Sequence, residues 1–291
     1  MLKQTRKRAQ DGGTVVYAPG SPIVHPIQLL QNMLVDLRSS FQLAYRLTVR
    51  DIAATYRQTA LGYLWAVLAP IVTSFTFIVL NKANLIRVDN ISVPYPAFVF
   101  VGTIFWQLFV DALNSPLKVV NLNRTMLSKI NFPKEALIIS GFGQVLFSFT
   151  IKLILLACAM VAFNIQVGWT VILLFLPIIG LLVVGTVIGM FLVPVGVLYQ
   201  DIQQALTYLT SALMFFTPVL YPAPSEGVLG KIIGYNPIAP FVIISREILF
   251  SLQLTQLRGT LVVIAVSMVL ILVVWILYRL AMPVLIERME A

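Results

Sequence analysis

The sequence predicts an all-α membrane protein with six transmembrane helices. Of its 291 residues, 59% are hydrophobic and only 11% are charged, and the mean hydropathy is +0.93. Soluble domains carry roughly 25% charged residues, so a chain this apolar cannot cover a water-facing surface and must use lipid as its solvent. Two further observations support this prediction: six long apolar stretches, and a clustering of basic residues outside them.

Each apolar stretch is long enough, or nearly so, to cross a bilayer, which takes about 20 helical residues. We expect spans at 61–80, 97–113, 136–163, 169–198, 205–221 and 261–282. The predicted organisation is a tail over 1–26, an interface-helix region over 27–58, a six-span domain over 59–285 and a C-terminus over 286–291.

Basic residues indicate how the chain is oriented. With six spans both termini share one side, and that side carries fourteen of the Lys and Arg residues against five on the other. The positive-inside rule therefore places both termini in the cytoplasm. The net charge of +9 would suggest nucleic-acid binding in a soluble protein. Here it reports topology, and no nucleic-acid partner is predicted.

Residues 27–50 have the periodicity of an amphipathic helix. Apolar residues recur at spacings of three and four, at Leu30, Met33, Leu34, Leu37, Phe41, Ala44 and Leu47, and Asp36, Arg38 and Arg46 lie off that stripe. This pattern predicts a helix lying in the cytoplasmic interface. It either anchors the chain to lipid or docks beside a partner, and Leu34, Leu37, Arg38 and Phe41 are its candidate contact residues.

Two further segments are neither spans nor short loops. Residues 118–135 are polar, basic and longer than a usual connection, which favours a functional role. Residues 222–258 lie on the outer side yet are half apolar, with short apolar pieces broken by Gly and Pro. Such pieces cannot span a membrane and predict a pair of re-entrant helices that dip in from the outer face.

The sequence lacks the motifs that ATP hydrolysis, metal binding and common catalytic triads require. Its one Gly-Lys pair, Gly230-Lys231, is not part of a phosphate-binding loop. A single cysteine, Cys158, and a single histidine, His25, leave no metal cluster or catalytic triad. We therefore predict a non-catalytic chain with no bound metal or cofactor. It either depends on a separate subunit that supplies the energy for transport or acts as a channel or facilitator.

One charge lies inside a predicted span. Lys152 falls in the third span, and Asp111 lies near the inner end of the second. Ionisable groups inside a membrane are functional by default, although a lysine can also extend its ammonium group toward the interface. Both interpretations of Lys152 stay open.

Motifs along the chain resemble the type-2 ATP-binding-cassette (ABC) permeases, in particular the polysaccharide and O-antigen export branch. They are Arg50-Asp51-Ile52, the run 56–62 followed by Trp65 and Pro70, Pro94-Tyr95-Pro96 with Gly102 and Trp106, the run 127–133, the run 217–221, Asn236-Pro237 and Arg246. The resemblance covers about residues 28–285. One departure is Gln200, where the family commonly has arginine between a tyrosine and an aspartate, so no role is carried onto it.

The resemblance implies a homodimer with two copies of a cytoplasmic ATPase, which bind the ATP and Mg²⁺, in a bacterial inner membrane. It implies that a coupling element docks into a cleft on the ATPase, with the interface helix beside it. In this sequence that element is Lys129, Ile130, Asn131, Phe132 and Pro133. The implied cargo is a polysaccharide carried on a polyprenyl diphosphate, as in lipopolysaccharide biosynthesis.

Two sets of residues suit that cargo. Arg50 and Arg57 flank the start of the first span, where the lipid diphosphate would enter, since arginine pairs with diphosphate oxygens through two parallel hydrogen bonds. Anchoring by the positive-inside rule explains them equally well. Aromatic residues could line a path for sugars, although aromatic residues also gather at the interfaces of most membrane proteins. The candidates are Tyr63, Trp65, Phe98, Phe100, Phe105, Trp106, Phe109, Tyr208, Phe215, Phe216 and Tyr221.

Other functions remain open at this stage. The same family could export teichoic acid, capsule, a lipid or a drug. The chain could instead be a stand-alone channel or facilitator, although the segment 118–135 would then have no evident purpose. A membrane-embedded transferase is disfavoured, because no cluster of catalytic carboxylates or histidines occurs.

Overall fold

The computed structural model describes residues 26–57, 64–83, 93–130, 132–199, 201–224 and 226–290, and every regular element within these ranges is helical. The elements are α1 (Pro26–Arg57), α2 (Leu64–Lys82), α3 (Tyr95–Leu122), α4 (Arg124–Lys129), α5 (Glu135–Ala162), the 3₁₀ helix η2 (Trp169–Leu174), α6 (Phe175–Gly196), α7 (Asp201–Phe215), α8 (Gly227–Tyr235), α9 (Ala239–Leu249) and α10 (Leu257–Glu290). The predicted all-α class is confirmed for this part of the chain.

Four described helices are long and apolar enough to cross a bilayer. They are Tyr95–Leu122, Glu135–Ala162, Trp169–Gly196 and Leu257–Arg288, and they match the second, third, fourth and sixth predicted spans. The predicted first and fifth spans correspond to α2, whose apolar part is Pro70–Lys82, and to α7, which has 15 residues. The chain is a multi-pass membrane protein, and the count of six spans stays a prediction.

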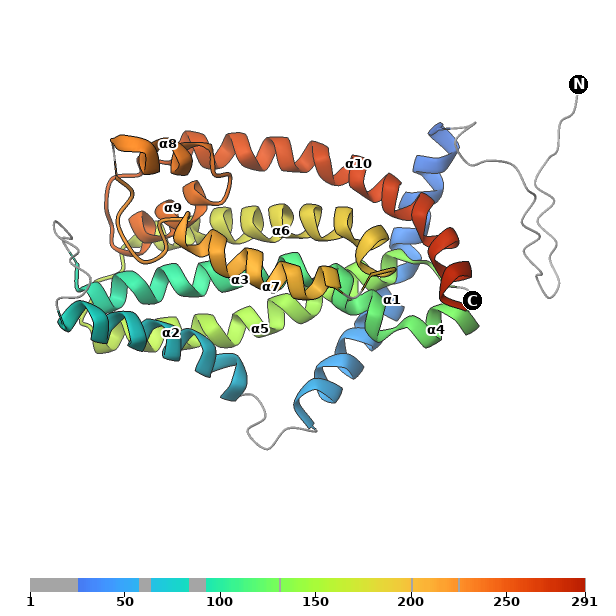
Figure 1. The fold of residues 1–291 in the computed structure, drawn as a ribbon, viewed down its shortest axis with the longest axis horizontal. Coiled ribbons are helices and arrows are strands. Elements are labelled where there is room, and N and C mark those ends of the chain that lie inside the picture. Colours follow the sequence, from blue (N-terminus) through green and yellow to red (C-terminus); the bar gives the residue numbers. More distant parts are fainter. Residues whose placement is uncertain are drawn as a thin grey trace, which may run out of the picture.

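Helix α3 forms the centre of the bundle. It packs against α6 on one side and against α5 and α2 on the other, while α10 covers the far side of α6 (Figure 1). Most of α3 is buried, including Phe105, Leu108 and Phe109. The close contact with α6 depends on glycine, because a Cβ at Gly185 would lie 2.7 Å from Ala112 Cβ, and one at Gly189 would overlap the carbonyl oxygen of Leu113.

The helix ends fall into two groups at opposite ends of the bundle. Helices α1 and α4 and the C-terminal part of α10 lie at one end, and α8 and α9 lie at the other (Figure 1). The first end carries the arginines and lysines of α1, α4 and the last turns of α10. It is therefore the end that the charge pattern assigns to the cytoplasm.

Helix α1 confirms the predicted amphipathic helix and shows two apolar faces. Its buried face, which includes Met33, Ala44 and Leu47, belongs to the side that packs on α5. Leu34 and Phe41 are each 58% exposed and lie on a different face. Leu37 is half-buried between these faces, and Arg38 is exposed. An exposed apolar face on a helix at the end of a membrane bundle suits contact with the lipid interface.

Several predicted boundaries shift. Helix α3 continues through Pro116 to Leu122, so the first residues of the segment 118–135 are helical, and α4 forms the middle of that segment. Helix α7 ends at Phe215, and residues 217–220 form a buried turn. Helices α8 and α9 meet at an angle of 94°, as expected for a broken or re-entrant pair. The predicted tail up to residue 25, residues 58–63 and Gln200 lie outside the described residues.

Candidate functional site

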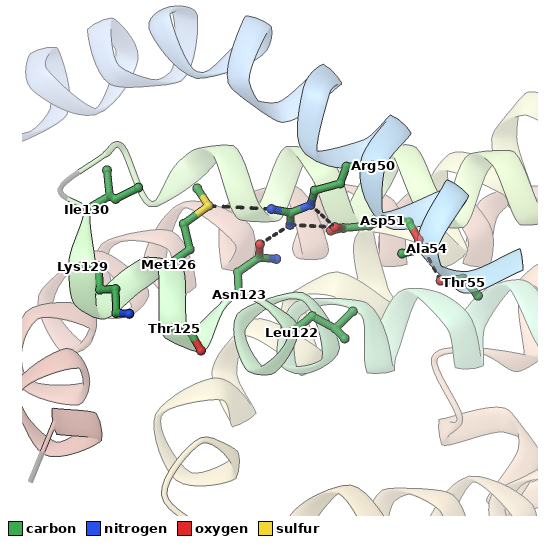
Figure 2. Close-up of a pocket in the computed structure, with 10 residues that line it drawn as sticks. All are labelled: Arg50, Asp51, Ala54, Thr55, Leu122, Asn123, Thr125, Met126, Lys129 and Ile130. Atoms are coloured by element: carbon green, nitrogen blue, oxygen red, sulfur yellow. Dashed lines mark hydrogen bonds and ion pairs between the residues drawn. The ribbon is translucent and has the colours of Figure 1, made fainter. Parts of the chain in front are cut away.

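A pocket lies where α1 meets the end of α3 and α4. Its volume is about 670 Å³, and Figure 2 shows side chains of all three helices facing it. Its lining combines apolar side chains with polar ones, and its charged residues are the cations Arg50 and Lys129 and the carboxylate Asp51. The lining comprises Arg50, Asp51, Ala54, Thr55, Leu122, Asn123, Thr125, Met126, Lys129 and Ile130. The pocket is therefore amphiphilic and lies at the basic end of the bundle.

Arg50 extends from α1 across the pocket (Figure 2). Its Nε and Nη2 atoms donate to Asp51 Oδ1 over 2.8 and 2.7 Å, and Nη2 also donates to Asn123 Oδ1. Its Nη1 atom contacts the thioether of Met126 at 3.8 Å, its only partner among the described residues. The Arg50 side chain is 50% exposed. The guanidinium is thus held in place by Asp51 and Asn123, and Nη1 is the nitrogen with no oxygen acceptor among the described residues.

Asp51 ties this arginine to the membrane bundle. Its side chain is only 7% exposed, and its second oxygen, Oδ2, accepts a hydrogen bond of 3.2 Å from Gln144 Nε2 on α5. Gln144 Nε2 also lies 3.4 Å from Ser140 Oγ, which is itself 3.4 Å from Thr48 Oγ1 on α1. A chain of polar contacts therefore links the pocket to α5.

The predicted coupling residues divide into exposed and buried ones. Lys129 and Ile130 are exposed and line the pocket, with Ile130 55% exposed. Phe132 is 9% exposed, and the ammonium group of Lys134 lies 5.0 Å from its ring centre. Burial lowers the pKa of Lys134, and the neighbouring Glu135 partly offsets this shift. Pro133 is half-buried, and Asn131 lies outside the described residues.

The structure does not bring both predicted arginines together. Arg57 is exposed in the last turn of α1 and does not belong to the pocket lining. Arg50 is joined in the pocket by Lys129 from α4, which the sequence placed in a different functional group. The two predicted groups, the lipid-contacting arginine and the coupling lysine, thus share one pocket.

Lys152 lies inside the bundle and is paired. Its Nζ lies 2.5 Å from Asp111 Oδ2, and the lysine side chain is only 4% exposed. Asp111 Oδ1 also accepts a hydrogen bond of 3.0 Å from Gln107 Nε2. The pair joins α3 to α5, and the sequence identified both charges without predicting their contact.

Residues 42–250 match the family described as ABC-2 type transporter. This match covers more than half of the chain. The chain belongs to that family. The resemblance predicted from the motifs is thereby confirmed, and the region matched runs from α1, through the pocket, to the end of α9.

Named relatives agree with this assignment. The chain is 26% identical over 228 residues to the O-antigen export system permease protein RfbA of Myxococcus xanthus, an alignment that covers 77% of this chain and 86% of that protein. It is 26% and 24% identical over 227 residues to two proteins of the same name from Klebsiella pneumoniae, which covers 74% of this chain and 83% of each of them.

The candidate path-lining aromatics of this ABC-2 chain fall into two sets. Phe105, Trp106 and Phe109 are buried in the protomer: the ring of Phe105 lies 5.8 Å from that of Phe149, and that of Trp106 lies 5.4 Å from that of Phe109. Phe98 and Phe100 are also buried, and Tyr221 is half-buried. Tyr208, Phe215 and Phe216 are exposed. Tyr63 and the side chain of Trp65 lie outside the described residues.

At the opposite end, Arg246 on α9 occupies a site that sequence reasoning did not assign. Its guanidinium is buried and donates to the carbonyl oxygens of Phe98 over 3.1 Å, Pro218 over 2.6 Å and Val219. It also lies 3.6 Å from the centre of the Phe98 ring. Arg246 was named among the motifs of the resemblance without a predicted role, since its carbonyl partners depend on tertiary structure.

A third arginine connects three helices at the basic end. Arg279 on α10 pairs with Asp36 on α1 at 2.5 Å and with Glu135 at the start of α5 at 2.9 Å. The neighbouring Tyr278 donates to the Lys134 carbonyl oxygen over 3.4 Å. This cluster joins the interface helix, the last span and the end of the segment 118–135.

Proposed function

We propose that this chain is the transmembrane pore subunit of an ATP-driven exporter that moves a polyprenyl-diphosphate-linked polysaccharide, similar to O-antigen, across the inner membrane. The observation that carries the proposal is the pocket between α1 and α4, where a half-exposed arginine and a lysine stand beside apolar side chains. The names of the relatives from Myxococcus xanthus and Klebsiella pneumoniae point the same way.

The chemistry of the pocket suits a lipid-linked diphosphate. Nη1 of Arg50 can donate a charge-assisted hydrogen bond to a phosphate oxygen, since Nε and Nη2 are already bonded to Asp51 and Asn123, and Lys129 adds a second positive charge. Ala54, Leu122 and Met126 offer apolar surface to the first isoprene units of the carrier. The pocket selects phosphate on an apolar chain, so it fits teichoic acid or capsule precursors as well as O-antigen.

ATP hydrolysis would take place on a separate cytoplasmic subunit that binds ATP and Mg²⁺. The exposed side chains of Lys129 and Ile130 are available to that subunit, whereas Phe132 supports the segment from inside the protomer. Closure of the ATPase dimer would shift α4 and α1 together and so bias the spans between two arrangements. The chain itself is not an enzyme in this proposal.

A second copy of the chain would complete the export path along α7. Only Leu206 and Thr210 of this helix are buried. Its exposed residues include Gln203, Gln204 and Thr207, and the exposed aromatics Tyr208 and Phe215 also belong to it. Sugars stack on aromatic faces and bond to amides, so a homodimer joined near α7 would give a polymer a suitable wall. Phe105, Trp106 and Phe109 would serve in packing instead.

The direct test is reconstitution with the cognate cytoplasmic ATPase. We expect Lys129→Ala and Ile130→Ala to weaken association of the ATPase with the chain, measured without lipid-linked glycan, because both residues lie on the exposed side of the coupling segment. Omitting the glycan separates this effect from lipid binding, since both residues also line the pocket. Ile232→Ala, an exposed apolar residue on α8 at the opposite end, is the matched control. If no ATPase associates with the chain, or if the variants behave as wild type, a stand-alone channel becomes the better interpretation.

The lipid site is tested separately with a polyprenyl diphosphate that carries no sugar. We expect Arg50→Gln to weaken its binding about tenfold or more, since one charge-assisted hydrogen bond contributes on the order of 1.5–3 kcal/mol. Arg57→Gln removes the same charge from the same helix outside the pocket and should bind as wild type. Equal losses in the two variants would indicate general surface attraction and would overturn the pocket assignment.

A further inference from the structure

A second, smaller cavity lies between α1, α3 and α5, next to the pocket described above. Its volume is about 250 Å³. Its lining comprises Ile52, Thr55, Asp111, Asn114, Ser115, Lys118, Gln144, Val145, Phe147 and Ser148. Thr55 lines both spaces. The hydrogen bond from Gln144 to Asp51 crosses between them, since Gln144 belongs to one lining and Asp51 to the other.

The polar groups of this cavity are largely uncommitted. Asn114 donates through Nδ2 to the Val110 carbonyl oxygen of its own helix, and Gln144 donates through Nε2. Among the described residues, no donor reaches the amide oxygens of Asn114 and Gln144. In the same part of the chain, no hydrogen bond or ion pair engages the side chains of Ser148 and Lys118.

Among the described residues, no fully buried side-chain nitrogen or oxygen atom lacks a hydrogen-bond partner, so the unengaged groups of this cavity are open to water. Helices α3 and α5 are both long enough and apolar enough to span the membrane, and polar groups facing a cavity between such helices are costly unless water or a ligand bonds to them. Intramembrane polar clusters of this kind mark the paths of polar substrates. The cavity is therefore a site for a ligand that replaces water.

The lining favours a neutral, polyhydroxylated ligand. Amide oxygens accept hydrogen bonds, hydroxyl groups both donate and accept, and the ammonium of Lys118 donates. Lys152 neutralises the carboxylate of Asp111, so apart from Lys118 the polar groups that the lining offers are uncharged hydroxyls and amides, which suit the hydroxyl groups of a sugar. Ile52 and Phe147 supply apolar surface of the kind on which the C–H edges of a sugar ring pack. The small volume limits the ligand to about one ring.

We propose that this cavity binds the first sugar of the lipid-linked glycan while the diphosphate occupies the neighbouring pocket. This inference rests on the proposed function, since the lipid diphosphate must first bind beside Arg50. The two spaces meet at Thr55, as a diphosphate and the sugar attached to it require. The chain would then recognise the carrier and the reducing-end sugar together, and Asp111, Asn114 and Ser148 would set the preference for that sugar.

The test compares two probes in nanodiscs: a polyprenyl diphosphate without sugar and the same lipid carrying one hexosyl residue. We expect wild type to bind the glycosylated lipid more tightly. Asn114→Leu and Ser148→Ala should each lower the affinity for the glycosylated lipid about three- to tenfold, as expected for loss of one hydrogen bond. Both variants should leave the affinity for the bare lipid unchanged. Thr150→Val is the matched control, because Thr150 is exposed on α5 and, within the part of the chain that the structure describes, its hydroxyl bonds only to the Leu146 carbonyl oxygen of its own helix.

The outcomes separate this inference from the proposed function. If wild type binds both lipids equally, the cavity holds only water, and the sugar site is overturned while the diphosphate pocket stands. If Asn114→Leu weakens both lipids equally, its role is structural and the sugar site is again overturned. If neither lipid binds wild type, both proposals fail. Ser148→Ala removes a single hydroxyl group, so it decides the question even if the leucine variant does not fold.

Discussion

The ion pair between Lys152 and Asp111 joins two long apolar helices, α5 and α3, and its lysine side chain is only 4% exposed. The ammonium and carboxylate lie 2.5 Å apart, and Gln107 donates to the second carboxylate oxygen. Side chains point toward the N-terminal end of their own helix, and α3 and α5 run in opposite directions. The side chains of Asp111 and Lys152 therefore point in opposite directions along the bundle, which favours their contact. Lys152 therefore neutralises Asp111 within the bundle.

Replacing one partner of this ion pair should destabilise the protein more than replacing both. Lys152→Met leaves a largely buried carboxylate without its partner, and we expect a loss of about 3–5 kcal/mol. The double variant Lys152→Met with Asp111→Leu should recover most of that loss, because no uncompensated charge remains. Thermal unfolding of the four proteins in detergent completes the double-mutant cycle. A double variant as unstable as the single one would contradict the pairing.

Arg246 illustrates a different solution for a buried charge. Its donors reach three backbone carbonyl oxygens on two segments, α3 and the turn after α7, and its Cζ lies 3.6 Å from the centre of the Phe98 ring. Gly102 is required beside it, because a Cβ there would overlap the guanidinium. The arginine thus fixes α9 against the outer half of α3.

Replacing Arg246 with lysine should not preserve this arrangement. Lysine keeps the charge but cannot satisfy three carbonyl oxygens from one planar group, so we expect Arg246→Lys to cost about 2–3 kcal/mol, the value of one or two lost charge-assisted hydrogen bonds. Lys231→Arg, on the exposed side of α8, controls for an exchange of the two basic residue types. Unchanged unfolding of Arg246→Lys would show that the charge alone is sufficient.

At the scale of helices, the Arg279 cluster determines how α1 is held. The salt bridges to Asp36 and Glu135 attach the interface helix to both α10 and the start of α5. All three side chains belong to the basic end, where the proposed ATPase would act. A movement of the segment 118–135 would therefore be transmitted to α1 through Glu135 and Arg279.

Removing this connection should loosen α1 without unfolding the bundle. Because Arg279 and Asp36 are partly exposed, solvent screening limits the effect, and we expect Arg279→Gln to cost about 1 kcal/mol. Amide hydrogen exchange in the first half of α1 should become about fivefold faster as a result. Arg288→Gln is the control on the same helix, since Arg288 is exposed and makes no ion pair among the described residues. Equal exchange in both variants would contradict the connection.

Hydropathy predicted the helices better than their ends. The centres of α3, α5, α6 and α10 coincide with predicted spans because long apolar runs have few alternatives in lipid. The inner end of α3 was predicted too early, because Asn114, Ser115 and Pro116 interrupt the apolar run although the helix continues to Leu122. The end of α7 was predicted too late, because residues 217–220 are apolar yet form a turn at Pro218.

The candidate site was only partly predictable for a related reason. Arg50 and Lys129 were recognisable from local motifs, but their common pocket depends on how α1 packs beside α4, which no local pattern records. The contact of Lys152 with Asp111, separated by 41 residues, has the same origin. Burial of Phe105, Trp106 and Phe109 also follows from the central place of α3, which hydropathy does not distinguish from a lipid-facing position.

At the scale of the whole molecule, the exposed faces of the helices differ in chemistry. The long helix α10 exposes mainly leucine and valine, including Val262, Val269 and Val273, as expected for contact with lipid tails. Helix α7 exposes Gln203, Gln204 and Ser211 beside its aromatics. Polar side chains at the surface of a membrane bundle are unfavourable against lipid. The α7 face therefore requires water or a second copy of the chain.

Cysteine cross-linking in membranes distinguishes these faces. In a Cys158→Ser background, which removes the one native cysteine, we expect a bis-maleimide long enough to span the path to cross-link Tyr208→Cys into a dimer, because α7 would face its counterpart across the export path. Val269→Cys, which replaces an exposed residue of α10, should stay monomeric because lipid covers it. Cross-linking through Val269 and none through Tyr208 would place the dimer interface on α10, and the polar residues of α7 would then have to face water within a single protomer.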